Sequence, residues 1–389
     1  MIVTDLPACT LRCSLMRTPT YLWMCALISS GQQASIKEKP LWCFYTPHTP
    51  SSNVTYQPVD IPVEYCSVVA YAYIGLTDSG RNLSSLHPEI DYGSGGFYKL
   101  KGLKEKQLDL LIYLAIGGSE TDSALFGIAV EDASVRAELI NSIVLWLNYF
   151  DYDGVVLHID HPESYTTTDN TNDLIMAMGN ILKGHRKGFS VILPPEASRR
   201  NTLFSPFDYA VMLDVYVIQW SHNILESPDV PSCPAPLYAD DGLSVAGILN
   251  SILSSYDTRR LQTMLNKFMF TFSFAGLKYH IHKPTGRHRK LRPVRRMAAV
   301  DLRSATTVAY HEICENVVRR RWNSTYNAES GCMDSGDLST WVSYPGRPPR
   351  SILSLIGGAV AFDLQMDDFM GLCGRKNPLT RTLYHLLNK

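Results

Sequence analysis

The sequence has almost no excess of charge, and this absence limits the partners that it can attract. Its 389 residues carry 36 Lys and Arg against 37 Asp and Glu, for a formal net charge of −1. No global field draws the chain to nucleic acid or to an anionic membrane, so we expect neither as a partner. Outside the N-terminal segment, no apolar run approaches the length of a transmembrane helix, so we expect no membrane span and a soluble mature chain.

Metal-binding spacings, internal repeats and low-complexity linkers are also missing. The nine cysteines include no C-x-x-C pair and no histidine cluster accompanies them, so we expect neither a metal nor a cofactor. Six cysteines form an even, widely spaced set: Cys43, Cys66, Cys233, Cys314, Cys332 and Cys373. Three disulfides formed in an oxidising compartment are the simplest interpretation, and six buried free thiols of a cytosolic enzyme are the alternative.

Residues 1–38 have the features of a secretory leader. From Met16 onward, a basic residue precedes a short apolar stretch over Tyr21–Ile28, and small and polar residues follow. This order predicts a signal peptide that starts at Met16 and is cleaved near residues 30–34, with a disordered tail as the alternative. Triplets for N-glycosylation begin at Asn53, Asn82 and Asn323. Together these features predict a secreted, extracellular glycoprotein.

Short β-rich apolar runs recur along the chain, with helical patterns between them. Several runs are continuously apolar rather than alternating, as is typical of parallel strands buried on both faces. The predicted strands cover residues 41–46, 67–75, 110–117, 154–159, 189–194, 213–219, 268–274 and 357–363. Repeated βα units of this kind predict a (β/α)8 TIM barrel over residues 39–389, and a doubly wound sheet is the alternative.

The longest stretch outside the predicted core is an insertion between the seventh and eighth strands, at about residues 276–350. Within it, seven Lys and Arg residues gather over residues 283–296. Such a run can bind a sulfated glycan or another polyanion, or it can be a solvated loop without a ligand.

One segment resembles the catalytic signature of a known enzyme family. Residues 152–162 read Tyr-Asp-Gly-Val-Val-Leu-His-Ile-Asp-His-Pro, which resembles Phe-Asp-Gly-x-Asp-x-Asp-Trp-Glu-Tyr-Pro of family 18 glycoside hydrolases. Further fragments resemble the family in the same order, at 114–118, 235–238, 310–314, 341–344 and 357–369. The resemblance covers about residues 40 to 389 and implies the family's barrel.

In that family the signature supplies the chemistry. The enzymes hydrolyse β-1,4-linked N-acetylglucosamine polymers, in which the sugar's acetamido oxygen attacks the anomeric carbon while a glutamate protonates the leaving oxygen. Val156 and His158 stand here at the positions of two aspartates, and Asp160 stands at the glutamate. Asp160 draws its carboxyl back by about 1.5 Å, and a misplacement of this order can cost about 10²-fold in rate. Neither Val156 nor His158 supplies the negative charge that the cationic intermediate needs.

The resemblance also implies a sugar-binding cleft with altered contacts. The family's Met-x-Tyr-Asp corresponds to Gln219–His222, so a serine and a histidine replace the tyrosine and the aspartate. Phe362 replaces the tryptophan that lies beneath the reacting sugar, and phenylalanine still offers an apolar face. The sugar-binding candidates are Phe362, Trp220, Tyr216, Ser221 and His222. The resemblance further suggests the disulfides Cys43–Cys66 and Cys314–Cys373, and Cys233 and Cys332 then pair by elimination.

Three functional hypotheses follow. The leading one is a secreted, monomeric, catalytically inactive chitinase-like protein that binds chitin, a chito-oligosaccharide or a related N-acetylated glycan in the cleft. The second is a slow hydrolase that uses Asp160 as its general acid. The third is a protein- or heparin-binding signalling scaffold that uses residues 283–296. A separate alternative is that His158, Asp160 and Glu163 only satisfy one another as a polar cluster at the barrel mouth and bind nothing.

Overall fold

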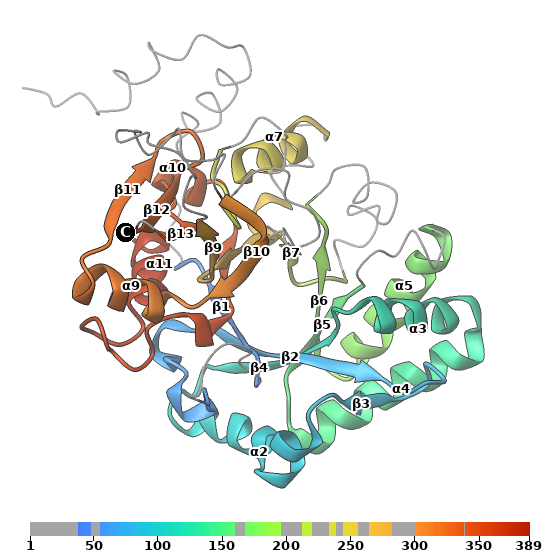
Figure 1. Ribbon diagram of the computed structural model, residues 1–389. Helices are drawn as coiled ribbons and strands as arrows, with labels where there is room; N and C mark the ends of the chain where they lie inside the picture. Colours follow the sequence, from blue (N-terminus) through green and yellow to red (C-terminus); the bar gives the residue numbers. More distant parts are fainter. Residues whose placement is uncertain are drawn as a thin grey trace, which may run out of the picture. The chain divides into compact units, whose positions relative to one another are not determined.

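Eight parallel strands close into a barrel in the computed structural model, as the sequence predicts (Figure 1). The structure describes residues 38–47, 55–159, 168–195, 212–219, 233–238, 244–255, 264–281, 300–337 and 339–389. The barrel strands are β1 (Leu41–Tyr45), β2 (Val68–Leu76), β4 (Leu111–Gly117), β5 (Gly154–His158), β6 (Gly188–Leu193), β7 (Tyr216–Ile218), β8 (Phe268–Ser273) and β14 (Gly358–Phe362). Because β1 pairs with both β14 and β2, the sheet is closed, and the doubly wound alternative is wrong.

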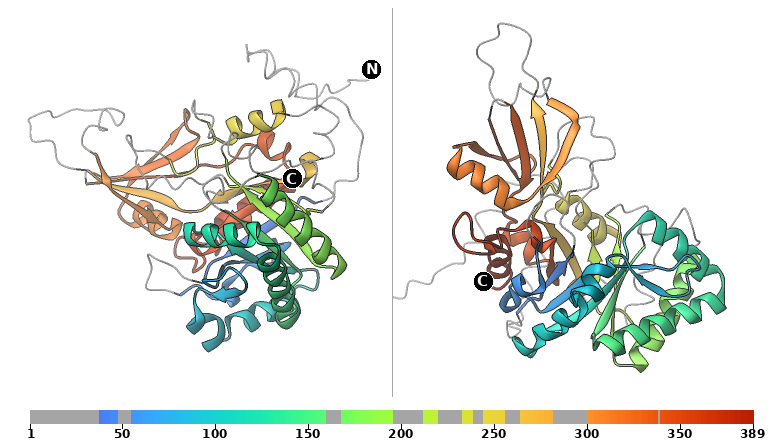
Figure 2. Two further views of the ribbon diagram at one scale, coloured as in Figure 1. Left: turned by 90° about the vertical axis from the view of Figure 1, so that its right-hand side faces the viewer. Right: turned by 60° about the horizontal axis from the view of Figure 1, so that its bottom comes forward.

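Helices accompany the strands on the outside of the barrel (Figure 2). They are α2 (Gly96–Lys101), α3 (Glu120–Glu131), α4 (Ala133–Phe150), α5 (Thr168–Gly184), α7 (Val245–Ser255), α10 (Arg350–Leu353) and α11 (Pro378–Leu387). Shorter 3-10 turns lie at Pro58–Asp60, Val63–Tyr65, Gly102–Glu105, Leu265–Lys267 and Leu364–Met366, and a π turn at Glu89–Gly93. A short strand, β3 (Leu83–Ser85), pairs antiparallel with β2. No helix in the described ranges has both the length and the apolarity to span a membrane.

The interior of the barrel is filled with apolar side chains from every second strand position. Its members are Trp42, Phe44, Val68, Ala70, Ala72, Tyr113, Ala115, Val156, Ile192, Val217, Met269 and Val360. Side chains alternate across each strand, so the residues between these point outward to the helices. Each fully buried aliphatic side chain contributes about 1.5–3 kcal/mol of stability relative to exposure. The lower part of the barrel is therefore a packed core, and any site must lie at an end of the strands.

The insertion between β8 and β14 folds into a second sheet. Its strands are β9 (Gly276–Ile281), β10 (Val300–Val308), β11 (Asn323–Asn327), β12 (Cys332–Gly336) and β13 (Thr340–Pro345), with helix α9 (Tyr310–Arg319) between β10 and β11. All pairings are antiparallel, in the order β10-β9-β13-β12-β11 (orange strands in Figure 2). Val308, Ile313, Trp322 and Val342 form its own small apolar core. The insertion is thus a folded unit at the sequence position that we predicted.

Three disulfides tie distant parts of the chain together. Cys43 bonds to Cys66, Cys233 to Cys332 and Cys314 to Cys373. All three pairs agree with the sequence analysis, including the pair assigned by elimination. The free-thiol alternative is therefore wrong for these six residues.

Candidate functional site

The carboxyl ends of the barrel strands form the site, and we call this end the barrel mouth. Val156, on β5, lies one layer below it and is completely buried. It pairs in register with Ala115 on β4 and Ser190 on β6, and it belongs to the apolar interior of the barrel. The hydroxyl of Ser190 is buried and has no hydrogen-bond partner in the structure. Position 156 is therefore a packing position that carries no charge.

His158, at the end of β5, is held by hydrogen bonds at both ring nitrogens. Its Nδ1 lies 3.1 Å from the hydroxyl of Tyr73, and its Nε2 lies 3.2 Å from the side-chain oxygen of Gln219. Because an amide oxygen only accepts, Nε2 carries a proton, and the Tyr73 hydroxyl donates to Nδ1 when the ring is neutral. The side chain is 5% exposed. This imidazole is fixed in place as a bridge between β2 and the end of β7.

Two glycines allow the backbone to approach His158 closely. Gly117 and Gly118 end the motif that resembles the family's third strand, and both have positive φ, +96° and +82°. A Cβ on Gly117 would lie 2.2 Å from the carbonyl oxygen of His158, and one on Gly118 would lie 3.0 Å from the ring of Tyr73. The Gly118 N–H donates to the same His158 carbonyl at 3.0 Å. The retained glycines therefore support the geometry of this bridge.

Phe362 provides an aromatic face at the mouth. It ends β14, is partly exposed, and packs on the apolar interior of the barrel, with its ring centroid 5.5 Å from that of Phe44. A partly exposed ring backed by a packed core is fixed in orientation, which suits stacking on a sugar ring. Phe362 thus presents a partly exposed aromatic ring at the mouth, and its contact with sugar stays a prediction.

A carboxyl group that the sequence analysis did not single out follows directly. Asp363 lies next to Phe362, and its Oδ1 accepts a hydrogen bond of 3.2 Å from the Thr46 hydroxyl. Burial of this carboxyl raises its pKa to about 6, although the Thr46 bond favours the charged form. Asp363 is therefore an acidic group at the mouth that titrates near neutral pH.

The parts of the signature that are retained carry structural contacts. Asp153 accepts the Ile112 N–H at 2.7 Å and pairs with Lys104 at 2.8 Å, which ties the start of β5 to β4. A side chain on Gly154 would lie 2.5 Å from the ring of Tyr113. The frame thus persists because the barrel needs it, while the residues between, which hold the chemistry in the family, have changed.

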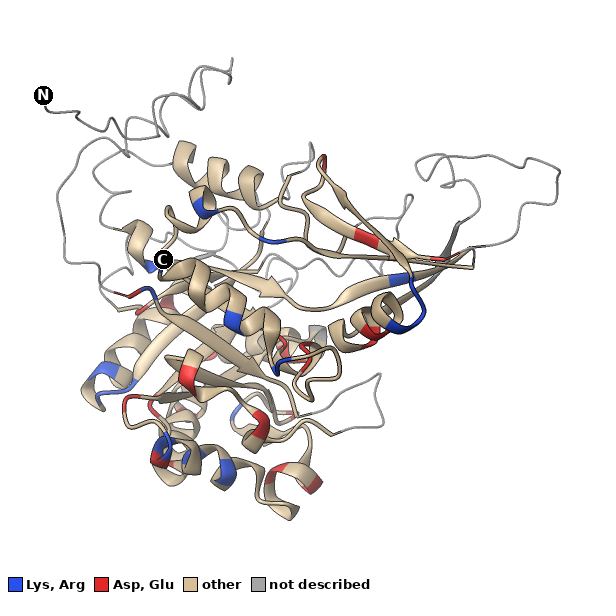
Figure 3. Cartoon of the chain, turned by 90° about the vertical axis from the view of Figure 1, so that its left-hand side faces the viewer, with Lys and Arg blue, Asp and Glu red and all other residues tan. Residues whose placement is uncertain are grey.

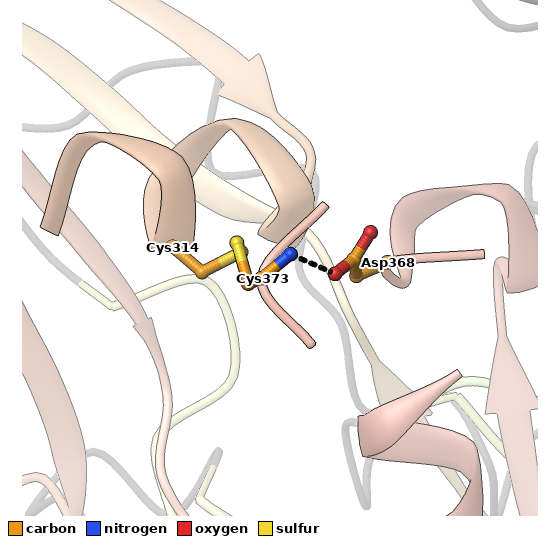
Figure 4. Close-up of side chains that lie close together, drawn as sticks. All are labelled: Cys314, Asp368 and Cys373. Atoms are coloured by element: carbon orange, nitrogen blue, oxygen red, sulfur yellow. Dashed lines mark hydrogen bonds between the residues drawn. A yellow bond between two sulfur atoms is a disulfide. The ribbon is translucent and has the colours of Figure 1, made fainter. Parts of the chain in front are cut away.

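The aspartates after β14 have the same structural character. Asp367 accepts the N–H groups of Leu379 and Thr380 at the start of α11, at 3.2 and 2.9 Å. Asp368 accepts the N–H groups of Leu372 and Cys373, at 2.9 and 2.8 Å (Figure 4). Burial raises the pKa of Asp367, and its hydrogen bonds oppose this.

One group of neighbouring side chains has the types of atom that ligate metals. Cys314, Asp368 and Cys373 lie within 4.8 Å of one another, and no other such group exists within the described ranges. The two sulfurs are bonded to each other, and the carboxylate accepts the Cys373 N–H (Figure 4). The carboxylate also accepts the Leu372 N–H. Since a disulfide sulfur is not a thiolate ligand, this cluster does not fit a metal.

Tyr216 requires a correction. We expected it among the aromatic side chains that stack on sugar, but it is 0% exposed and its ring stacks on Phe268, with centroids 5.3 Å apart. Its neighbour Val217 faces the barrel interior, so Tyr216 points outward, away from the mouth. The alternation of the strand places it in the outer core and removes it from the candidates.

Several other candidate residues fall outside the part of the chain that the structure describes. Asp160, Trp220, Ser221 and His222 lie outside the described residues, as do the leader, Asn53 and the basic run 283–296. Asn82 and Asn323 are both exposed, as a glycosylated asparagine must be. Tyr73 and Gln219, which hold His158, were not predicted as site residues. The signal available in the sequence was their place at the ends of predicted strands.

The mouth of this TIM barrel carries an aromatic platform, and strand β5 lacks the acidic pair of the family signature. These two features define the class of glycosidase-type TIM barrels with an altered catalytic strand. The sequence model described as "Glycosyl hydrolases family 18" matches residues 40–367. The chain belongs to this family.

Relatives of two kinds are similar to the chain. An endochitinase of Manduca sexta is 25% identical over 376 residues, covering 88% of this chain and 65% of the relative. The chitinase-like protein Idgf1 of Drosophila melanogaster is 20% identical, covering 85% of this chain and 90% of the relative. The chain spans less than two thirds of the length of the first curated relatives that it matches.

Solved structures confirm the fold. The Group IV chitinase of Ostrinia furnacalis has a TM-score of 0.75 and 17% identity, covering 90% of this chain and 100% of that structure. Human YKL-39, described as a pseudo-chitinase with retained chitooligosaccharide binding, has a TM-score of 0.71 and 19% identity, with coverage of 90% and 100%. A chitinase and a pseudo-chitinase therefore share this barrel fold.

Proposed function

We propose that this protein is a secreted chitinase-like protein that binds a chito-oligosaccharide, or a related N-acetylated glycan, at the barrel mouth without hydrolysing it. The observation that carries the proposal is the state of β5. Where the family has an acidic pair, Val156 is completely buried among apolar groups and His158 is held at both ring nitrogens. Neither residue can balance positive charge on the sugar.

The loss of rate follows from electrostatics. Stabilisation of developing charge by fixed groups in a site sheltered from water is usually the largest contribution to catalysis, and one lost group costs about 10²–10³-fold. Here two carboxylates are absent, and the carboxyl at Asp160 is one methylene shorter than the family's glutamate. The three changes together leave little of the acceleration.

Binding is less demanding than catalysis and needs only a platform and polar partners. Phe362 keeps an aromatic face at the mouth, fixed against Phe44. Human YKL-39, a protein with the same fold, is described as retaining chitooligosaccharide binding as a pseudo-chitinase. These two observations favour a glycan ligand over an empty scaffold.

Secretion agrees with the covalent structure. Disulfides persist in oxidising compartments, and this chain has three between distant segments. The exposed positions of Asn82 and Asn323 suit glycosylation, and a leader that starts at Met16 would direct the chain to the secretory route. We further propose that the secreted protein is a monomer.

Titration calorimetry with chito-oligosaccharides of increasing length tests the proposal. Phe362→Ala should weaken binding between about twofold and about tenfold, because it removes an aromatic face worth about 0.5–1.5 kcal/mol in stacking. Phe362→Trp, which restores the family's residue, should tighten it. Tyr149→Ala serves as control, since Tyr149 is a 70% exposed aromatic on α4 outside the mouth. Equal affinities across all four proteins would contradict binding at the mouth.

A slow hydrolase is the second candidate, favoured by the carboxyl that Asp160 retains and by the likeness to the Manduca sexta endochitinase. It requires that Asp160→Asn abolish a measurable turnover while leaving the affinity for oligosaccharide within about threefold. Absence of turnover in the parent protein excludes this candidate. A heparin-binding scaffold through residues 283–296 requires retention on heparin that disappears when those cations are neutralised.

A further inference from the structure

A pocket rich in basic side chains lies along helix α11. Its volume is about 370 Å³, and its cationic lining is Arg347, Arg375, Arg381 and Lys389. Thr382 and His385 add polar groups, and the buried Leu386 also lines the pocket. In Figure 3, α11 is the helix that ends at the label C, and no acidic position is coloured on it.

The periodicity of the helix brings several of these groups together. Arg381 and His385 are four residues apart on α11 and therefore lie along one face of the helix. Lys389 follows two residues after the helix ends at Leu387, so the positive charge is spread along the pocket rather than concentrated at one point. The His385 ring also contacts Tyr65 and Tyr384, with centroid distances of 6.2 and 5.5 Å.

The segments that carry the other two arginines are fixed. Arg375 follows Cys373, whose disulfide to Cys314 and whose N–H bond to Asp368 hold the chain there. Arg347 lies two residues after the end of β13 at Pro345. Both arginine side chains are exposed, and the anchored backbone keeps them beside the pocket.

These cations are also uncompensated. Within the described part of the chain, none of the four makes an ion pair or a side-chain hydrogen bond. Basic side chains at a surface more often sit beside acidic ones, as Arg319 sits 2.6 Å from Glu315 in this protein. Four unpaired cations around one pocket attract an anionic ligand and cost little desolvation of existing pairs.

Lys389, one of the lining residues, lies near the end of the barrel opposite the mouth. Asn388, next to Lys389, accepts a hydrogen bond of 2.7 Å from the Lys39 N–H, just before β1 begins. Phe362 is not among the residues that line the pocket.

We propose that this pocket binds an oligosaccharide that carries sulfate esters. Guanidinium groups form paired hydrogen bonds with the oxygens of sulfate and phosphate groups. The volume falls within the range of small-ligand sites, about 300–1,000 Å³, which exceeds what one tetrahedral anion needs. A ligand with sulfates on successive sugar units can span the charged face of α11, and Leu386 offers an apolar surface to a sugar ring.

Calorimetry with a size-defined heparin hexasaccharide tests this proposal on the full chain. Arg347→Gln combined with Arg381→Gln should weaken binding at least tenfold, because each loses charge-assisted hydrogen bonds. Lys99→Gln combined with Lys106→Gln removes the same charge from exposed positions near α2, and it should change affinity less than twofold. Equal weakening by the two pairs would overturn the proposal.

Further arms separate other sources of binding. The chemically desulfated hexasaccharide should not bind; if it binds as tightly as the sulfated one, sulfate recognition is wrong. Thr382→Asp, which places a carboxylate in the pocket at an exposed position, should weaken binding as strongly as the arginine pair. Binding that disappears only when the cations of 283–296 are neutralised would overturn the proposal. Binding to vesicles of anionic phospholipid, without binding to the hexasaccharide, would also overturn it.

Discussion

Returning the family's carboxylate to position 156 should now destabilise the protein in a way that depends on pH. Val156 is 0% exposed and surrounded by apolar side chains. An aspartate there can avoid burying its charge by taking up a proton. About three pH units separate neutral pH from the usual Asp pKa of about 3.9, and each costs about 1.4 kcal/mol, so forced protonation costs about 4 kcal/mol.

One neighbour reduces this cost. Ser190 pairs in register with Val156 on the adjacent strand, and its buried hydroxyl has no partner. A hydrogen bond from this hydroxyl to the new carboxyl contributes about 1 kcal/mol. We therefore expect Val156→Asp to lower the free energy of unfolding by about 3–4 kcal/mol more at pH 7 than at pH 4, because the Ser190 hydrogen bond and the cost of burying the neutral carboxyl are common to both pH values.

Urea denaturation followed by tryptophan fluorescence at both pH values measures these changes. Val156→Thr is the matched control, because threonine has nearly the same shape as valine and adds a hydroxyl that does not titrate. Its cost in free energy of unfolding should therefore not depend on pH. In a Ser190→Ala background, Val156→Asp should cost about 1 kcal/mol more than in the parent. If Val156→Asp is as stable as the parent at pH 7, or equally destabilised at both pH values, the reasoning is refuted.

Two further predictions concern titration and covalent structure. The pKa of Asp363 is raised to about 6. The protonated carboxyl therefore contributes to the free energy of unfolding below the pKa of the unfolded chain, and this contribution is lost as pH rises from about 4 to 6. Asp363→Asn should remove up to about 3 kcal/mol of this loss, measured by denaturation across that range; an unchanged pH profile would contradict the burial of the carboxyl. Replacing Cys233 and Cys332 by serine opens a loop of sequence separation 99, and replacing Cys43 and Cys66 opens one of 23. The chain-entropy relation gives about 4.7 and about 3.4 kcal/mol, so the first double variant should show the lower denaturation midpoint; the reverse order would contradict this relation.

The barrel could be predicted because its strands are buried on both faces. Continuous apolar runs locate them. In seven of the eight predicted ranges, both ends lie within one residue of the ends of the observed strand. The run at 213–219 was longer than β7, which covers only Tyr216–Ile218. The insertion sheet was not predicted, because strands such as β11 are exposed at almost every position and have no apolar pattern to find.

The sequence predicted which positions belong to the candidate site, but not which side chains contact one another there. The comparison with the family signature identified Val156 and His158, since both are aligned within one short segment. The partners of His158 come from strands far away in sequence, at Tyr73 and Gln219, and only the closed barrel brings them to its ring. The pKa of Asp363 likewise depends on burial between β14 and the end of β1, which no local pattern reports.

The central claim is that the barrel mouth binds sugar but does not cut it. The most direct test incubates the purified protein with a fluorogenic chito-oligosaccharide and follows binding and release of the fluorophore together, with Asp160→Glu alongside. We predict saturable binding with no turnover in the parent, and no more than a trace in Asp160→Glu, because the glutamate alone does not restore the acidic pair at 156 and 158. Turnover by the parent that Asp160→Asn removes would contradict the account and show that Asp160 still delivers a proton.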